Sequence, residues 1–184
     1  MKVTRQQMLA ILGDGQRVDY FLHYINAWAE TFEINTPLRF AHFLAQCCHE
    51  TAGFKMTRET CLKGKNSYFN KYEQGKLGKM LGNTQKGDGA KFRGRGLLML
   101  TGRANYTAYM NSGFCKGNII SNPELLEQPL GATKSGMWYW WKHGLNAVAD
   151  KDDVVAVTKK INGGTNGLES RKKWLATCKK ALGL

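Results

Sequence analysis

The chain has 184 residues, enough for one domain with a buried core, and its 42% hydrophobic content with only three prolines excludes a disordered protein. Its 27 basic residues against 14 acidic ones give a formal net charge of +13. This charge predicts attraction to a polyanion, without choosing among nucleic acid, an acidic membrane surface and an anionic cell wall.

The first third of the chain predicts three helices joined by short turns. Apolar residues at spacings of three and four predict helices over 4–12, 16–33 and 37–51. Thr4 suits the N-cap of the first helix, and Pro37 suits the first turn of the third. Polar residues on the third helix share one stripe, namely Arg39, His42, Gln46 and His49. Glu50 lies beside this stripe at the end of the helix.

The remaining chain begins with a glycine-, lysine- and asparagine-rich segment, residues 60–95. We expect it to be mostly irregular, with one short helix near 68–80. Helices are then predicted over 103–111, 123–127, 130–143, 150–161 and 167–181. The aromatic segment MWYWW at 137–141 is expected in the core, because aromatic side chains dominate buried area. The sequence therefore predicts a mainly α protein, one domain of two lobes.

Metal-binding and nucleophile motifs are absent from the sequence. "HET" at 49–51 begins like a zinc-binding helix, but Gly53 stands where the second histidine is required. The five cysteines are odd in number and have no CxxC spacing, which favours reduced, mostly buried thiols. No GxSxG motif occurs. We therefore expect neither a metal nor a cofactor.

Two carboxylates, Glu50 and Glu59, remain as candidates for chemistry. Hydrolysis of a glycosidic bond needs one protonated acid and one ionised carboxylate. Glu50 follows an apolar stretch at a helix C-terminus, and both features favour the neutral form. Glu59 stands between Arg58 and Lys63, which favour the ionised form. The alternative is two solvated surface charges, since spacing in sequence does not prove proximity.

Three stretches of the sequence together resemble glycoside hydrolase family 19, the chitinase-like family, in the version found in bacteriophage endolysins. They are AHFLAQCCHETAGF (41–54), KFRGRGLLMLTGRANY (91–106) and INGGTNGLESR (161–171). The resemblance covers essentially the whole chain in order. It implies a lysozyme-like two-lobed helical fold with a catalytic cleft between the lobes, and one catalytic domain over residues 1–184.

The resemblance also implies roles for individual residues. Glu50 falls on the general acid, Glu59 on the general base, and Thr101 on a hydroxyl that holds the attacking water. The residues expected on the substrate are His49, Asn105, Tyr106, Asn162 and Arg171. Arg171 matches an arginine that supports the catalytic network, and an arginine near Glu59 would keep that carboxylate charged. Met99 stands where the family usually has glutamine, which puts one sugar contact in doubt.

The function expected from this resemblance is a monomeric endolysin that cleaves β-1,4 bonds of bacterial peptidoglycan with inversion. The apolar patch near the start, MLAIL, is shorter than a signal-peptide core, and no segment is long enough to cross a membrane. We therefore expect the protein to wait in the host cytoplasm until the membrane is permeabilised, and then to act on the wall. The alternatives are a chitinase, with the same chemistry, and a non-catalytic wall-binding module.

The basic surface is expected to hold the protein against an anionic envelope. A candidate for this contact is the C-terminal stretch RKKWLATCKKALGL, with Trp174, Leu175, Cys178 and Leu182 on one face. The alternative is that this face packs on the core. Nucleic acid is not expected as a partner, because MWYWW is followed by a single basic residue, Lys142.

Overall fold

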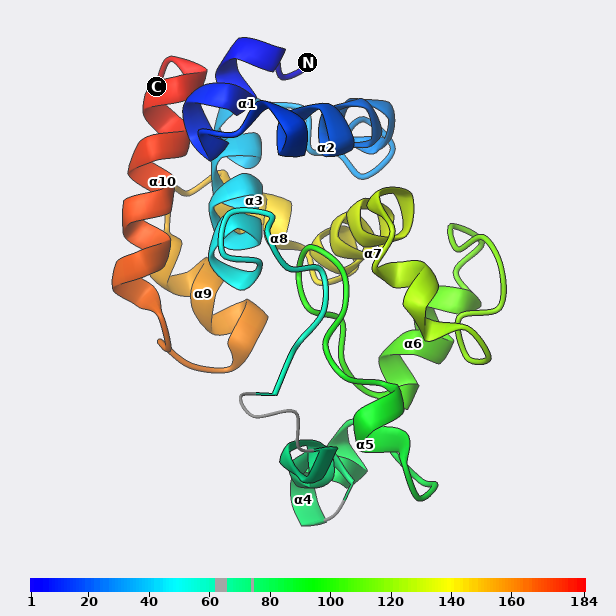
Figure 1. The fold of residues 1–184 in the computed structure, drawn as a ribbon. Helices are drawn as coiled ribbons and strands as arrows, with labels where there is room; N and C mark the ends of the chain where they lie inside the picture. The colour runs from blue at the N-terminus through cyan, green and yellow to red at the C-terminus, as the bar shows by residue number, and fades with distance from the viewer. Residues whose placement is uncertain (62–65, 74) are drawn as a thin grey trace. The chain divides into compact units, whose positions relative to one another are not determined.

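The structure, a computed structural model, describes residues 1–61, 66–73 and 75–184 and is mainly helical there (Figure 1). The α-helices are α1 (Arg5–Leu12), α2 (Gly15–Trp28), α3 (Pro37–Glu50), α4 (Gly75–Met80), α5 (Asp88–Lys91), α6 (Arg103–Met110), α7 (Pro129–Lys142), α8 (Leu145–Ala149), α9 (Val154–Asn162) and α10 (Leu168–Leu182). The 3-10 helices are η1 (Asn66–Tyr72) and η2 (Pro123–Leu126). In the described part of the chain, no helix has the length and apolar character needed to span a bilayer.

The chain divides into two compact units. The first unit comprises residues 1–55 and 137–184, and the second unit comprises residues 56–136. This division agrees with the mainly helical, two-lobed chain predicted from the sequence. A catalytic cleft between the lobes and a single catalytic domain over the whole chain stay predictions.

Short polar side chains begin the helices where the sequence indicated. The Thr4 hydroxyl accepts from the Gln7 backbone N–H at 3.2 Å, and the Gln7 side chain accepts from the Thr4 N–H at 2.9 Å. This reciprocal pair satisfies two N–H groups that the helix itself leaves free. Thr36 caps α3 by accepting from the Arg39 N–H, with Pro37 in the first turn.

α3 forms the centre of the first unit, and all its residues from Phe40 to Cys48 are buried. α10 packs along α3 and also contacts α1 and α9 (Figure 1). The apolar face of α10 lies in this packing, since Leu175, Cys178 and Leu182 are buried. The prediction that this face contacts the envelope is therefore wrong, and the alternative, packing on the core, is correct.

Two predicted helix boundaries in the first unit were wrong, the end of α2 and the start of α9. α2 ends at Trp28, earlier than predicted, and the Ile34 N–H then donates back to the Ala29 carbonyl at 2.8 Å. The helix expected from residue 150 is α9, which Asp153 caps by accepting from the Ala156 N–H at 2.9 Å. α8 was not predicted.

The aromatic segment 137–141 is largely core, as predicted. Met137, Trp138 and Trp140 are buried, and the Trp140 indole N–H donates to Asn146 Oδ1 at 2.7 Å. Trp141 is the exception, with 40% of its surface exposed.

The second unit contains more helix within residues 60–95 than the sequence predicted. η1 and α4 take the place of one short helix, and α5 was not predicted. η1 contacts both α4 and α5. Asp88, at the start of α5, is 2% exposed and accepts from Arg103 and from the N–H groups of Thr84 and Gln85. Residues 62–65 and 74 of this segment lie outside the described residues.

Candidate functional site

The polar stripe of α3 packs against the C-terminal part of the chain, with His42 and Gln46 buried and Arg39 and His49 half-buried. Each of its members contacts a residue more than 100 positions away: Arg39 pairs with Asp150, His42 with Asp152, Gln46 with Arg171 and His49 with Ser170. The stripe is therefore a set of tertiary contacts within the first unit and not a solvated face. These contacts fix α3 at both ends, including the end that carries Glu50.

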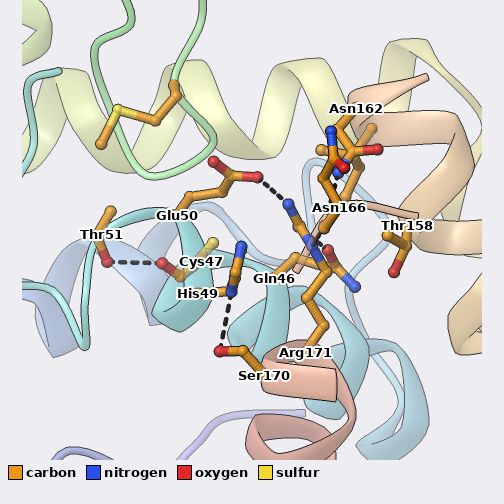
Figure 2. Close-up of polar contacts among 12 residues, drawn as sticks. Gln46, Cys47, His49, Glu50, Thr51, Thr158, Asn162, Asn166, Ser170 and Arg171 are labelled. Carbon is orange, nitrogen blue, oxygen red and sulfur yellow. Dashed lines mark hydrogen bonds and ion pairs between the residues drawn. The ribbon is translucent and has the colours of Figure 1, made fainter. Parts of the chain in front are cut away.

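Glu50 forms an ion pair with Arg171 at the C-terminal end of α3. Arg171 Nη2 donates to Glu50 Oε1 at 2.6 Å, and the two side chains are 2% (Arg171) and 19% (Glu50) exposed. Figure 2 shows the carboxylate, from α3, and the guanidinium, from α10, pointing toward one another. No described residue of the first unit donates to the second oxygen, Oε2. Arg171 thus holds Glu50 through Oε1, and Oε2 accepts no hydrogen bond from the described residues of the first unit.

The buried guanidinium of Arg171 is held on its other sides by neutral acceptors. Its Nη1 donates to Gln46 Oε1, and its Nε donates to the Asn166 carbonyl at 3.4 Å. Gln46 is fully buried. Because a guanidinium is planar, acceptors on several of its edges fix its position and its plane.

The structure corrects one expectation for Arg171. Its ion pair with the expected acid, Glu50, agrees with an arginine that supports the catalytic carboxylates, and an arginine near Glu59 stays a prediction. At 2% exposure its side chain has no surface to offer a substrate, so the prediction of a direct substrate contact is wrong. Arg171 acts through Glu50.

His49 is half-buried beside the ion pair. Its Nδ1 lies 3.0 Å from Ser170 Oγ (Figure 2). Burial lowers the pKa of His49, and the nearby Arg171 charge lowers it further, which outweighs the opposite effect of Glu50. The ring is therefore neutral near pH 7, and its contact with substrate stays a prediction.

Asn162 is exposed at the end of α9 and organises the loop to α10. Its Nδ2 donates to the Asn166 carbonyl at 3.0 Å, and its Oδ1 accepts from the Gly164 N–H at 2.8 Å. The side chain thus holds the loop whose Asn166 carbonyl reaches Arg171. A role in binding the glycan stays a prediction.

Glu59 lies in the second unit, surrounded by hydrogen-bond donors. The Tyr72 hydroxyl donates to Oε1 at 2.9 Å, Lys71 Nζ lies 3.5 Å from the same oxygen, and the Gly94 N–H donates to Oε2 at 3.3 Å. An ionised carboxylate only accepts, so these neighbours match the charged form expected of a base. Lys63, which was predicted to favour the ionised form of Glu59, lies outside the described residues.

The backbone brings Glu59 close to Thr101 through the segment 94–96. The Glu59 N–H donates to the Gly94 carbonyl at 2.8 Å. A Cβ at Gly94 would lie 3.2 Å from Thr101 Oγ1, a tight contact, and 3.5 Å from Glu59 Cβ, an ordinary one, so this glycine lies directly beside both residues. The Thr101 hydroxyl donates to the Met99 carbonyl at 2.7 Å, which leaves its oxygen free to accept a hydrogen from water.

Two further predicted substrate residues follow Thr101. Asn105 is half-buried in α6, and its Nδ2 donates to the Thr101 carbonyl at 2.8 Å, which leaves its Oδ1 for another partner. Its contact with substrate stays a prediction. Tyr106 is fully buried, and its hydroxyl donates to the Arg93 carbonyl at 2.8 Å and accepts from Arg95 at 3.1 Å. The prediction that Tyr106 contacts substrate is therefore wrong, and it supports the loop before Thr101.

Three residues around the two carboxylates were not found from the sequence: Gln46, which accepts from Arg171, and Lys71 and Tyr72, which contact Glu59. Gln46 is part of a quoted motif, but its role depends on Arg171 far along the chain. Lys71 and Tyr72 lie within the short helix expected near 68–80, but the segment has no apolar periodicity to indicate which of its side chains turn inward. Among the described residues, no three His, Cys, Asp or Glu side chains gather as metal ligands would.

The chemistry that these residues can perform is proton transfer. Glu50 has a fixed carboxylate with one available oxygen, and Glu59 has a carboxylate with a hydroxyl group nearby that can align water. The distance between the two carboxylates, expected at about 6.5–9.5 Å for an inverting hydrolase, stays a prediction.

Comparison with known proteins gives a consistent result. The family model described as chitinase class I, that of glycoside hydrolase family 19, matches residues 24–162. A glycosyl hydrolase family 19 domain-containing protein of Haemophilus influenzae is 32% identical over 174 residues, which cover 81% of this chain and 82% of that protein.

Solved structures show the same fold. Chitinase C from Streptomyces griseus HUT6037 has a TM-score of 0.74 at 21% identity, over 98% of this chain and 92% of that chain. A bacterial family 19 chitinase has a TM-score of 0.74 at 20% identity, over 99% of this chain and 95% of that chain. The fold is therefore that of family 19 chitinases, which is lysozyme-like. With its family model and its 32% identical relative, the chain belongs to glycoside hydrolase family 19 and is a glycoside hydrolase.

Proposed function

We propose that this family 19 enzyme hydrolyses β-1,4-glycosidic bonds of bacterial peptidoglycan by single displacement, as an endolysin. Glu50 gives its proton to the glycosidic oxygen, and the bond between that oxygen and the anomeric carbon breaks. Water attacks the same carbon from the opposite face, and Glu59 takes the proton that the water loses. Thr101 accepts a hydrogen bond from this water and aligns it.

The observation that carries the proposal is the ion pair between Glu50 and a buried arginine. Arg171 holds Oε1 at 2.6 Å and leaves Oε2, the oxygen that would carry the proton, without a donor among the described residues of the first unit. The free second oxygen suits a general acid, because a proton on it can point at the leaving oxygen and not at the protein. A buried arginine partner, 2% exposed, also distinguishes Glu50 from a glutamate that is only a solvated surface charge.

The choice of peptidoglycan is supported by charge. The net charge of +13 favours encounter with the anionic polymers of a bacterial envelope over encounter with uncharged chitin. The second candidate, a chitinase, is favoured by the family description and by the solved structures, which are named as chitinases. Both candidates share the chemistry and differ in the sugars bound beside it.

Replacing Glu50 tests the acid. We expect Glu50→Gln to lower the rate of wall clearing at least about 100-fold, since positioned proton transfer contributes about 10²–10⁴-fold. Glu50→Gln keeps an amide oxygen for Arg171 but removes the negative charge beside its buried guanidinium, so its thermal midpoint should fall, and clearing is measured well below that midpoint. Glu169→Gln is the matched control, an exposed glutamate of α10 whose loss should leave the rate unchanged.

Clearing by Glu50→Gln at the wild-type rate would contradict the role of Glu50 as the acid. Mass spectrometry of the released fragments separates the two enzymatic candidates. Muropeptides with a new reducing sugar identify a peptidoglycan hydrolase, whereas release of N-acetylglucosamine oligomers from chitin alone identifies a chitinase.

The proposal extends to the protein's place in the cell. The enzyme acts as a monomer, stays in the host cytoplasm until another factor opens the membrane, and then reaches the wall. Fractionation of expressing cells before and after membrane permeabilisation tests this order. Lysis of intact cells by the enzyme alone, with no permeabilising agent, would contradict it.

A further inference from the structure

Tyr72 and Lys71 contact the carboxylate that the proposed function makes the general base. Both are consecutive residues of η1, and both meet the same oxygen of Glu59, Oε1, at 2.9 Å and 3.5 Å. The other oxygen, Oε2, accepts from the Gly94 N–H at 3.3 Å, a longer hydrogen bond than the one that Tyr72 donates to Oε1. The two oxygens of Glu59 are therefore held unequally.

We propose that Tyr72 and Lys71 are positioning residues for the general base. They hold Oε1 of Glu59 so that Oε2 takes the proton from the attacking water. This proposal rests on the proposed function of Glu59. A carboxylate with two equivalent free oxygens would rotate about its last bond and present either of them. A hydroxyl donor on one oxygen removes this freedom before the substrate arrives.

Both donors keep their hydrogens throughout the pH range in which such an enzyme works. Burial and the neighbouring Glu59 raise the pKa of Tyr72 to about 12. The pKa of Lys71 is also raised, because hydrogen bonds with Tyr68 and Tyr72 and the charge of Glu59 outweigh the opposing effect of burial. Neither group exchanges its proton with Glu59 near neutral pH, so their role is to orient the base and not to relay protons.

The two donors are themselves fixed by the second unit. The Tyr72 carbonyl accepts from Asn83 Nδ2 at 2.8 Å, and Asn83 Oδ1 accepts from the first N–H of α6 at 2.8 Å. Lys71 Nζ lies 3.8 Å from the centre of the Tyr68 ring and 4.6 Å from that of Tyr72. The ammonium group is thus held between two aromatic rings while it faces Glu59.

The experiment is the pH profile of kcat/KM for Tyr72→Phe and Lys71→Met. We expect Tyr72→Phe to lower kcat about tenfold, the effect of removing one hydrogen bond to a charged group, and to leave KM within about twofold of the wild type. Loss of the donor stabilises the ionised form of the base less, so the acidic limb of the profile should move to higher pH. Lys71→Met should move it in the same direction by less, because its side chain is 41% exposed.

The controls separate positioning from structure. Tyr20→Phe, at an exposed tyrosine of α2, should leave both kcat and the profile unchanged. Lys71→Arg keeps a cation over the two rings and should restore the profile. The thermal midpoint shows whether Tyr72→Phe folds. If it does not fold, Lys71→Met and Lys71→Arg still test the proposal, because both variants keep the Tyr72 side chain.

Two results would overturn the proposal. The first is an unmoved acidic limb in Tyr72→Phe, whether or not its rate falls, because a structural role alone would not shift the limb. The second is an unmoved limb in Lys71→Met. Full activity of Glu59→Gln would instead reject the proposed base itself, whereas an inactive Glu59→Gln with a normal Tyr72→Phe rejects only the positioning role of Tyr72 and Lys71.

Discussion

At the scale of single residues, the buried guanidinium of Arg171 determines where the candidate acid lies. It reaches Gln46, Glu50 and the Asn166 carbonyl from one planar group. The three acceptors come from a helix and a loop that are far apart in sequence, so the arginine joins α3 to the α9–α10 loop. A lysine at this place has one ammonium on a flexible stem and cannot serve all three.

Arg171→Lys should therefore impair both catalysis and stability. We expect kcat to fall about tenfold or more, because Glu50 loses the fixed partner of its Oε1. The free energy of unfolding, measured with urea, should fall by about 1–3 kcal/mol, the cost of leaving a buried acceptor such as Gln46 Oε1 unpaired. Arg5→Lys, in an exposed pair with Asp19, is the matched control and should change neither quantity. Wild-type kcat in Arg171→Lys would show that Glu50 does not depend on this contact.

The sequence identified the two candidate carboxylates, but it did not show which side chains contact them. Glu50 stands in the first of the three stretches that resemble the family, and Glu59 follows that stretch in the next loop. Arg171 was identified too, but its partner was not, because a sequence does not show which side chain a residue more than 100 positions away will meet. The burial of Tyr106 was missed for the same reason, since it depends on Arg93 and Arg95 folding over it.

At the scale of elements, the loop between α9 and α10 brings the arginine and His49 together. Gly167, the N-cap of α10, has a φ of 72°. A Cβ there would lie 2.3 Å from Cε1 of the His49 ring, so the glycine permits the close approach of this loop to the end of α3. Gly163, the C-cap of α9, has a similar φ of 75°, but a Cβ there would meet no atom of the described residues within 4 Å.

These two glycines form a matched pair for substitution. Gly163→Ala should cost about 1 kcal/mol of unfolding free energy, the strain of a left-handed alanine, and should leave activity close to that of the wild type. Gly167→Ala adds the clash with the His49 ring to the same strain. We expect a larger loss of stability and a fall in kcat, because α3 and α10 must move apart where Glu50 meets Arg171. Equal effects of the two substitutions, measured by thermal unfolding and by wall clearing, would show that the contact with His49 is unimportant.

The long helices were predicted well from the sequence, and the short ones were not. α3 and α10 have apolar positions that repeat over several turns, so their periodicity is plain. α5 and α8 have four and five residues, too few for a repeat to show. α5 depends instead on the buried Asp88 and its ion pair with Arg103, a contact that forms only when α6 is in place.

At the scale of the whole molecule, the sequence predicted the two compact helical units and the family, because its three motifs are spread over the full chain. Net charge is the remaining property of this scale, and it bears on the choice of substrate. A charge of +13 gives a long-range attraction to an anionic wall that does not depend on any one residue. This attraction should act on encounter and not on the chemical step.

The salt dependence of activity tests this role of charge. The screening length falls from about 10 Å at 0.1 M salt to about 3 Å at 1 M, so kcat/KM on intact walls should fall several-fold across this range while kcat changes little. Walls from which the anionic polymers have been extracted carry the same glycan with less charge, and on them the fall should be much smaller. An equal fall on both substrates would place the salt effect on the enzyme's own ion pairs, such as the one between Glu50 and Arg171, and would remove charge as a reason to prefer peptidoglycan over chitin.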